Sequence, residues 1–126
     1  MTTTQEAVRT TQQVADQLVQ FCREGKYEEA QNELFSEDAE SIEPASAQGL
    51  QSVKGLDKIR KKGQDFQNML ETVHGGNISD PIVAGKFFAV EMSIDATYKG
   101  MGRQKMDEIA VYETQDGKIV KEQFFF

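Results

Sequence analysis

Hydrophobic residues recur at helical spacing in the first part of the chain. Val14 and Leu18 mark one apolar stripe, and the same spacing predicts a second helix over residues 27–35 and a third over residues 55–73. Between the last two, the stretch "SEDAESIEP" predicts a short strand that ends at Pro44, because proline has no N–H to donate to a neighbouring strand.

Local signals set the limits of the first helix. Thr3 and Glu6 have the spacing of a capping box, which predicts that the helix starts there, and Gly25 suits its C-terminal end. Residues 45–54, after the predicted strand, are small and polar and predict a loop.

After His74 the hydrophobic spacing changes to two, the period of a strand whose side chains alternate between faces. Four strands are predicted, over residues 77–85, 86–100, 104–115 and 117–126. The stretch "QDGK" between the last two predicts a tight hairpin, because Asp-Gly accepts the positive φ angles of such a turn.

The predicted order is α-α-β-α-β-β-β-β, with helices first and an antiparallel meander after them. This order is typical of an α+β protein. The 126 residues form one domain, residues 1–126, which is long enough to bury a core.

The last strands carry apolar side chains on both faces. Helices can cover only one face of a sheet, so a second apolar face needs a partner, because large exposed apolar patches mark interfaces. We therefore predict a homodimer through the outer sheet face. Its predicted contacts are Ile109, Val111, Val120, Phe124 and Phe126.

Composition excludes several classes of function. The formal net charge of −7 would repel a nucleic-acid backbone, and a basic cluster over residues 58–62 reads as a solvated helix face. No apolar stretch is long enough for a membrane helix and the N-terminus does not resemble a secretory signal, so we expect no membrane contact and a cytoplasmic location. Cys22 and His74 are the only residues of their types, which argues against a zinc site.

The element order, "SEDAESIEP" and "MDEIAVYETQDGKIV" together resemble the nuclear transport factor 2-like superfamily, and within it the SnoaL-like domains. The resemblance covers nearly the whole chain. It implies a cone, the cystatin-like α+β barrel, in which a curved antiparallel sheet wraps around the N-terminal helices and encloses a pocket. It also implies frequent dimerisation through the sheet, and cofactor-free enzymes such as ketosteroid isomerase and the polyketide cyclases.

The same resemblance implies a catalytic residue. In the isomerase the base is a carboxylate directly before a proline, in a stretch similar to "DAESIEP", and Glu43 has the matching place here. The two oxyanion donors of the isomerase fall near Leu18 and Ala110, neither of which can donate a hydrogen bond. The resemblance therefore argues against ketosteroid isomerase activity.

Several other residues are candidates for contact with a ligand. Glu108 and Tyr112 share a predicted strand face, and either could serve a pocket or simply pack. The full set of ligand-binding candidates is Glu108, Tyr112, Gln123, His74, Met92 and Phe66.

Three functions remain open, with no metal and no cofactor expected in any of them. The chain could be a cofactor-independent isomerase or cyclase that acts on a small, mostly apolar organic molecule with Glu43 as base. It could bind such a molecule without turnover. It could also be an interaction module whose pocket is filled by side chains.

Overall fold

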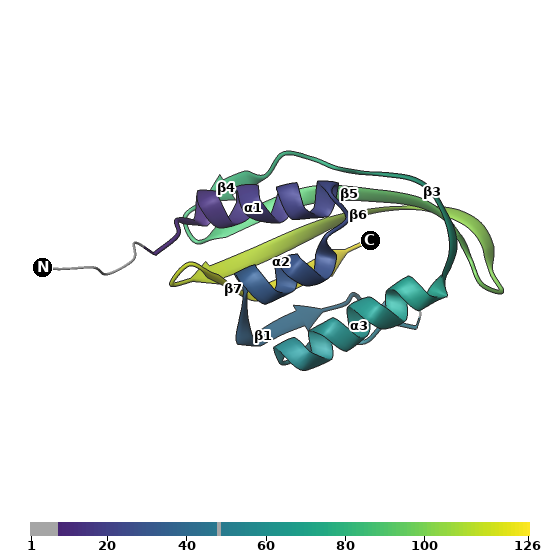
Figure 1. Ribbon diagram of the computed structural model, residues 1–126, viewed down its shortest axis with the longest axis horizontal. Helices are drawn as coiled ribbons and strands as arrows, with labels where there is room; N and C mark the ends of the chain where they lie inside the picture. Colours follow the sequence, from purple (N-terminus) through teal and green to yellow (C-terminus); the bar gives the residue numbers. More distant parts are fainter. Residues whose placement is uncertain (1–7, 48) are drawn as a thin grey trace, which may run out of the picture.

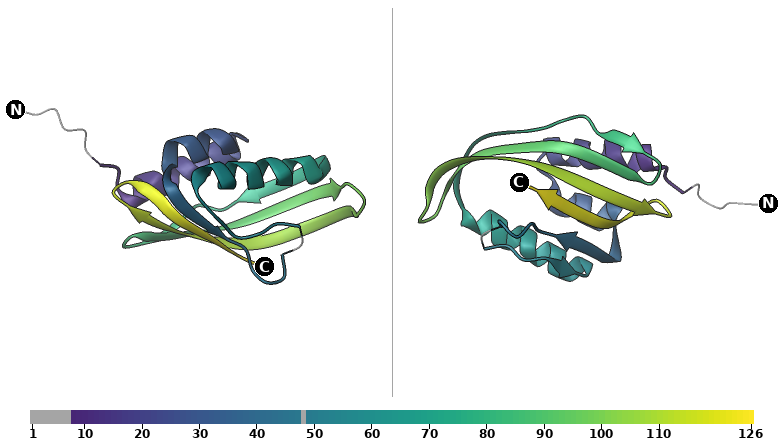
Figure 2. Two further views of the ribbon diagram at one scale, coloured as in Figure 1. Left: turned by 90° about the horizontal axis from the view of Figure 1, so that it is seen from below. Right: turned by 180° about the vertical axis from the view of Figure 1, so that it is seen from behind.

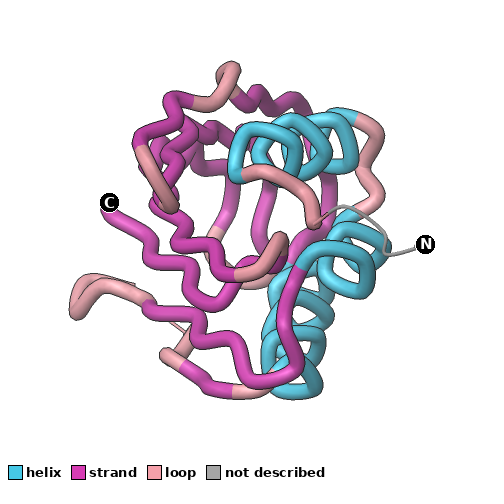
Figure 3. The backbone as a smooth tube through the Cα atoms, turned by 90° about the vertical axis from the view of Figure 1, so that its left-hand side faces the viewer, coloured by secondary structure: helices cyan, strands magenta, loops and turns pink. Residues whose placement is uncertain are grey.

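The computed structural model describes residues 8–47 and 49–126. The helices of this part of the chain lie on one face of a curved sheet, which bends partly around them (Figures 1, 2 and 3). The elements in chain order are α1 (Thr11–Arg23), α2 (Tyr27–Leu34), β1 (Phe35–Ile42), β2 (Val53–Lys54), α3 (Leu56–Met69), β3 (Leu70–Ile78), β4 (Ile82–Ala84), β5 (Phe87–Tyr98), β6 (Gly102–Gln115) and β7 (Lys118–Phe125). The predicted α+β class is confirmed. The sequence did not predict β2, nor the part of β3 that precedes residue 77.

Helix α1 begins later than its sequence signal suggested. Thr10 caps it: its hydroxyl accepts a hydrogen bond from the Gln13 N–H, and the Gln13 side chain accepts one from the Thr10 N–H. This is a capping box with glutamine in the fourth position. The predicted cap at Thr3 and Glu6 lies outside the described residues.

The sheet has the order β2-β1-β7-β6-β5-β3, and β4 pairs with one end of β5. One detail differs from the prediction: β1 pairs with β7 in parallel, so the sheet is mixed. The first strand enters after two helices rather than from a hairpin, which leaves it free to lie beside the last strand in either direction. This pairing brings β1 close to the C-terminus.

The third helix is shorter than predicted, because Leu70 and Val73 continue its apolar spacing but belong to strand β3. Leu70 pairs with Tyr98 and Val73 with Ala96 along β5. Pairing with β5, which is distant in the chain, therefore outweighs the helical pattern of residues 70–73. The predicted strand 77–85 is divided, since β3 ends at Ile78 and β4 begins at Ile82.

The hairpin between β6 and β7 has the predicted chemistry. Asp116 and Gly117 have φ angles of 51° and 76°, the left-handed conformation that a two-residue turn needs. Gly117 also packs so closely against Arg9 that an added Cβ would lie 3.1 Å from the Arg9 nitrogen.

A bulge in β7 corrects the predicted facing of the last strand. Thr114 pairs with Ile119 and Glu113 with Lys121, so Val120 is an extra residue in β7. An extra residue moves every later side chain to the opposite face.

The bulge determines where the C-terminal side chains lie. Phe124 and Phe126 were predicted on the outer face and instead line the concave side. Gln123, predicted inside, lies beside Val111, while Phe125 lies beside Ile109 on the outer face.

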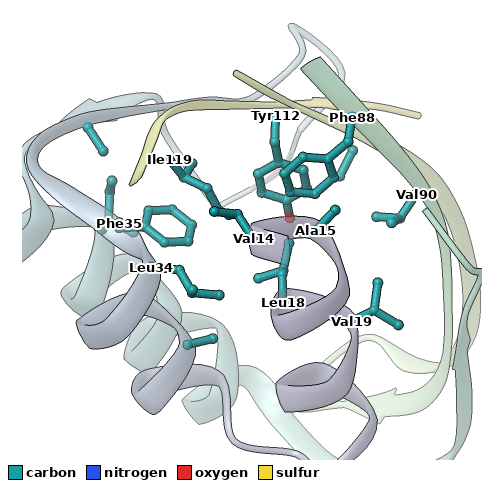
Figure 4. Packing of buried hydrophobic residues seen from close by; sticks show 14 of the residues in the cluster. Val14, Ala15, Leu18, Val19, Leu34, Phe35, Phe88, Val90, Tyr112 and Ile119 are labelled. Atoms are coloured by element: carbon teal, nitrogen blue, oxygen red, sulfur yellow. The ribbon is translucent and has the colours of Figure 1, made fainter. Parts of the chain in front are cut away.

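The core lies between the helices and the concave sheet face (Figure 4). Val14 and Leu34 are fully buried, as are Phe88 and Ile119 to within 1%. Burying each such side chain contributes roughly 1.5–3 kcal/mol. This core holds one end of the sheet against α1 and α2, and the space toward α3 forms a cavity.

Candidate functional site

A cavity of about 1130 Å³ lies between the helices and the concave sheet face. Apolar side chains make up much of its wall, among them Leu18, Leu50, Ile59, Phe66, Ile78, Met92, Ile94, Met106, Phe124 and Phe126. Its ionisable and hydroxyl groups include Glu43, Lys62, Glu108, Tyr112 and Glu122. A large apolar space with a few convergent polar groups is typical of a small-molecule site.

Glu43 and Lys62 form an ion pair at one side of the cavity. Glu43 follows β1 and Lys62 lies on α3, and Lys62 Nζ is 2.6 Å from Glu43 Oε2. Both side chains are nearly buried, at 6% and 11% exposure. Such a partner offsets part of the cost of burying a carboxylate.

Lys62 and Glu122 are connected through Ser41. Lys62 Nζ donates to Ser41 Oγ at 2.6 Å, and Ser41 Oγ donates to Glu122 Oε1 at 2.7 Å. Ser41 is on β1 and Glu122 on the neighbouring β7, so the parallel pairing of these strands brings the two residues together. Burial raises the pKa of Glu122 to about 7, although the Ser41 hydrogen bond and Lys62 act in the opposite direction.

Glu108 is the most loosely held of the three carboxyl groups. It lies on β6, opposite Met92 of β5, and is half-buried. Burial raises its pKa to about 7, and the nearby charges of Glu43 and Glu122 add to the rise while Lys62 reduces it. Within the described part of the chain its carboxyl group has no hydrogen-bonding partner, so it can interact with a ligand.

The structure brings most of the predicted ligand residues to one cavity. Glu43, Glu108 and Tyr112 line it, as do Met92 and Phe66.

Two predicted ligand residues lie elsewhere. Gln123 is turned outward by the bulge. His74 is exposed, with Nε2 2.7 Å from Thr97 Oγ1 at the sheet edge, and is not part of the cavity wall.

Sequence reasoning missed Lys62 and Glu122. Lys62 belongs to the basic cluster that was read as a solvated helix face, although its neighbour Lys61 is 75% exposed and Lys62 is not. Lys62 lies three residues after Ile59, a buried residue of the same helix. This spacing places the two side chains on one helix face and was a usable signal that Lys62 points inward. Glu122 was assigned to the outer face because no sequence signal marks the bulge at Val120.

Glu122 makes the stability of the protein depend on pH. The pKa of a free glutamate is 4.5 and that of Glu122 is about 7, so its contribution to stability is complete below 4.5 and is lost as pH rises through 7. Glu122→Gln keeps a neutral acceptor for Ser41. We expect this variant to be more stable than the unchanged protein at pH 8, by on the order of 3 kcal/mol, and equally stable at pH 4.5.

Urea unfolding at both pH values measures this difference. Glu113→Gln is the control, because Glu113 lies on the adjacent strand with Lys86 as its partner. Equal stability of Glu122→Gln and the unchanged protein at pH 8 would contradict the expectation.

The comparisons with known proteins agree with this architecture. The family model of the SnoaL-like domain matches residues 9–126. A solved protein from Mesorhizobium loti, described as SnoaL-like and as a candidate polyketide cyclase, is 30% identical to this chain, with a TM-score of 0.87 over 94% of this chain and 100% of its own. No protein with a curated function matches the chain.

Two further solved structures show the same fold at lower identity. An NTF2-like protein from Burkholderia thailandensis is 16% identical, with a TM-score of 0.80 over 93% of this chain and 90% of its own. A protein of unknown function from Xanthomonas campestris with a cystatin-like fold is 17% identical, with a TM-score of 0.78 over the same shares of both chains.

The fold and the cavity define an α+β protein of the NTF2-like, cystatin-like class. Within that class, the chain belongs to the family of SnoaL-like domains.

Two structural properties limit the possible sites. None of the helices in the described ranges has the length and apolar character needed to cross a membrane. Within residues 8–47 and 49–126, no three side chains of the kinds that bind metals lie close enough together to hold an ion.

Proposed function

We propose that this protein is a cofactor-independent enzyme that moves a proton next to the carbonyl group of a small, mostly apolar compound. One observation carries the proposal: Glu43, Glu108 and Glu122 line a single apolar cavity together with Lys62. Burial raises the pKa of Glu108 and Glu122 toward neutral pH, which makes these two carboxyl groups suited to general acid–base catalysis.

The geometry favours Glu108 as the group that exchanges the proton. Its pKa of about 7 allows it to accept and return a proton near neutral pH, and no group of residues 8–47 and 49–126 holds its carboxyl group. Glu43, the base predicted from the sequence, is already bound to Lys62 at 2.6 Å.

Lys62 has a different part in this proposal. Transfer of a proton from the ligand to the Glu108 carboxylate neutralises that carboxylate and leaves the negative charge on the ligand. The ammonium group of Lys62 offsets part of that charge, and Glu43 fixes its position.

The cavity volume and the pKa values of two cavity carboxyl groups favour this proposal over its two alternatives. A volume of about 1130 Å³ slightly exceeds the usual range for ligand sites, about 300–1,000 Å³, and counts against a pocket filled by side chains. Binding without turnover would need no carboxyl group with a neutral pKa, and Glu108 and Glu122 both have one.

Deuterium exchange tests the proposal without knowledge of the natural substrate. A panel of aryl ketones and 1,3-diketones is incubated with the protein in D2O, and proton NMR follows the loss of the signal beside the carbonyl. We expect protein-dependent exchange for at least one neutral compound of the panel. Binding of these compounds with no exchange above the protein-free rate would leave only the non-catalytic alternative.

The homodimer stays a proposal, now with a corrected set of contacts. Ile109 and Phe125 are paired neighbours on the outer face, at 50% and 47% exposure. Ile82 is 76% exposed and adjoins them through Ala89 and Val111. We expect a dimer of the 14.2 kDa chain at micromolar concentration, because these side chains form a continuous apolar patch.

Sedimentation or light scattering measures the mass of that species. Ile109→Asp is expected to shift it toward the monomer, whereas Met101→Asp, equally exposed at the β5–β6 turn, is the control that should remain dimeric. A monomeric mass for the unchanged protein would refute the dimer. The cytoplasm remains the proposed location, since a single cysteine cannot form an internal disulfide.

A further inference from the structure

Tyr112 is held in one orientation at the inner end of the cavity. It lies on β6, is 3% exposed, and forms part of the cavity wall. Its ring is stacked on that of Phe88, with centroids 4.8 Å apart and an angle of 14° between the planes. Figure 4 shows the hydroxyl end of the ring directed toward α1, the helix that carries Leu18.

The hydroxyl group of Tyr112 has no partner among the residues that the structure describes. Within residues 8–47 and 49–126 it makes no hydrogen bond, although it is surrounded by buried side chains. Buried hydroxyl groups nearly always have a partner, because leaving one without a hydrogen bond is unfavourable. Tyr98, on the neighbouring strand, follows the rule: its hydroxyl donates to Met106 Sδ at 3.2 Å.

The surroundings of this hydroxyl decide what it can bind. Burial raises the pKa of Tyr112 well above its ordinary value, and Glu122, Cys22 and Glu108 add to the rise, so the group keeps its proton and acts as a donor. Its partner must therefore be an acceptor. Two nearby carboxyl groups, those of Glu122 and Glu108, disfavour an anionic acceptor, which leaves a neutral oxygen such as that of a ketone.

Burial also indicates which end of a ligand reaches Tyr112. Tyr112 and Leu18 are each 3% exposed, whereas Phe126, on the same cavity wall, is 43% exposed. A neutral ligand with one oxygen and an apolar body would therefore place the oxygen inward and the body toward Phe126.

We propose that the Tyr112 hydroxyl donates the hydrogen bond that fixes the carbonyl oxygen of a neutral ligand at the inner end of the cavity. The inference rests on the proposed function, because it specifies how the carbonyl compound is oriented. It assigns Tyr112 a contact with the ligand, and it gives a physical reason for an unpaired donor in the core: the bond is completed only when a ligand is bound.

The inference predicts opposite effects on stability and binding. Tyr112→Phe removes an unpaired hydroxyl, so the melting temperature of the ligand-free protein should stay the same or rise. The same substitution should weaken binding of a ketone about tenfold. A hydroxyl with only a structural role would produce the reverse pattern. Tyr98→Phe is the matched control, since Tyr98 is equally buried and does not line the cavity.

Carbon NMR with cyclohexanone labelled at the carbonyl carbon provides the test. The unchanged protein and Tyr98→Phe should move the carbonyl signal downfield on binding, and Tyr112→Phe should bind more weakly and lose most of that shift. A full shift in Tyr112→Phe, or no ketone-dependent shift in the unchanged protein, would overturn the inference. This measurement needs no turnover. A downfield shift without deuterium exchange would therefore refute the proposed catalysis and leave the role of Tyr112 intact. Deuterium exchange without the downfield shift would refute the role of Tyr112 and leave the proposed catalysis intact.

Discussion

Replacing Glu108 by glutamine is expected to lower the rate of deuterium exchange by about 10²–10⁴-fold, the usual contribution of a positioned acid–base group. The amide keeps the shape of the carboxyl group but cannot accept the proton. Ketone binding should change little, since in the described part of the chain Glu108 has no hydrogen-bonding partner whose loss would disturb the cavity. The comparison of exchange with binding by NMR separates these two effects.

The dependence on pH provides a second measurement of the same group. The carboxylate form is the base, so the exchange rate should rise with pH and level off above about 7. Asp107→Asn is the matched control, because Asp107 is the preceding residue of β6 and its side chain is 68% exposed. Retention of exchange in Glu108→Gln would transfer the role of base to Glu43, which Glu43→Gln would then test.

The second large effect is expected from Lys62→Met. This substitution leaves Glu43 buried without its partner at 2.6 Å, and loss of one partner of a buried ion pair costs about 3–5 kcal/mol. For a domain of this size the loss corresponds to a fall in melting temperature of roughly 10–20 °C. Thermal unfolding at pH 8 measures the effect. At this pH a buried carboxylate is least able to lose its charge by taking up a proton.

Lys62 should also affect the remaining carboxyl groups. Its charge lowers the pKa of both Glu108 and Glu122, so the pH profile of exchange should move to higher pH in the variant. Lys61→Met provides the control: Lys61 is 75% exposed and its pair with Asp65 should contribute well under about 1 kcal/mol. A Lys62 variant as stable as the Lys61 variant would show that the ion pair does not hold this part of the cavity.

Much of the fold followed from local patterns. The apolar stripe of Val14 and Leu18 marked α1, and the alternation in β5 correctly placed Phe88, Val90 and Met92 on one concave face. These assignments succeed because a helix or strand that buries one face must repeat its apolar residues with its own period.

Part of the site could be anticipated in the same way. Glu108 and Tyr112 are each an even number of residues from Met106, so their shared face with Met106 was readable from the sequence. Glu43 was found through the similarity of "DAESIEP" to a known stretch. Its partner Lys62 was not found, because it was grouped with the other basic residues of α3 as a solvated helix face, although its spacing from the buried Ile59 favoured an inward side chain.

The sequence by itself determined the α+β class, the hairpin at Asp116 and Gly117, and a curved sheet with apolar side chains on both faces. Only the tertiary structure decided that Val120 bulges out of β7, which turns Glu122 and Phe124 into the cavity and Gln123 away from it. The reason is physical: periodicity reports the local preference of a segment, whereas a bulge and a buried ion pair depend on strands and helices that are distant in the chain.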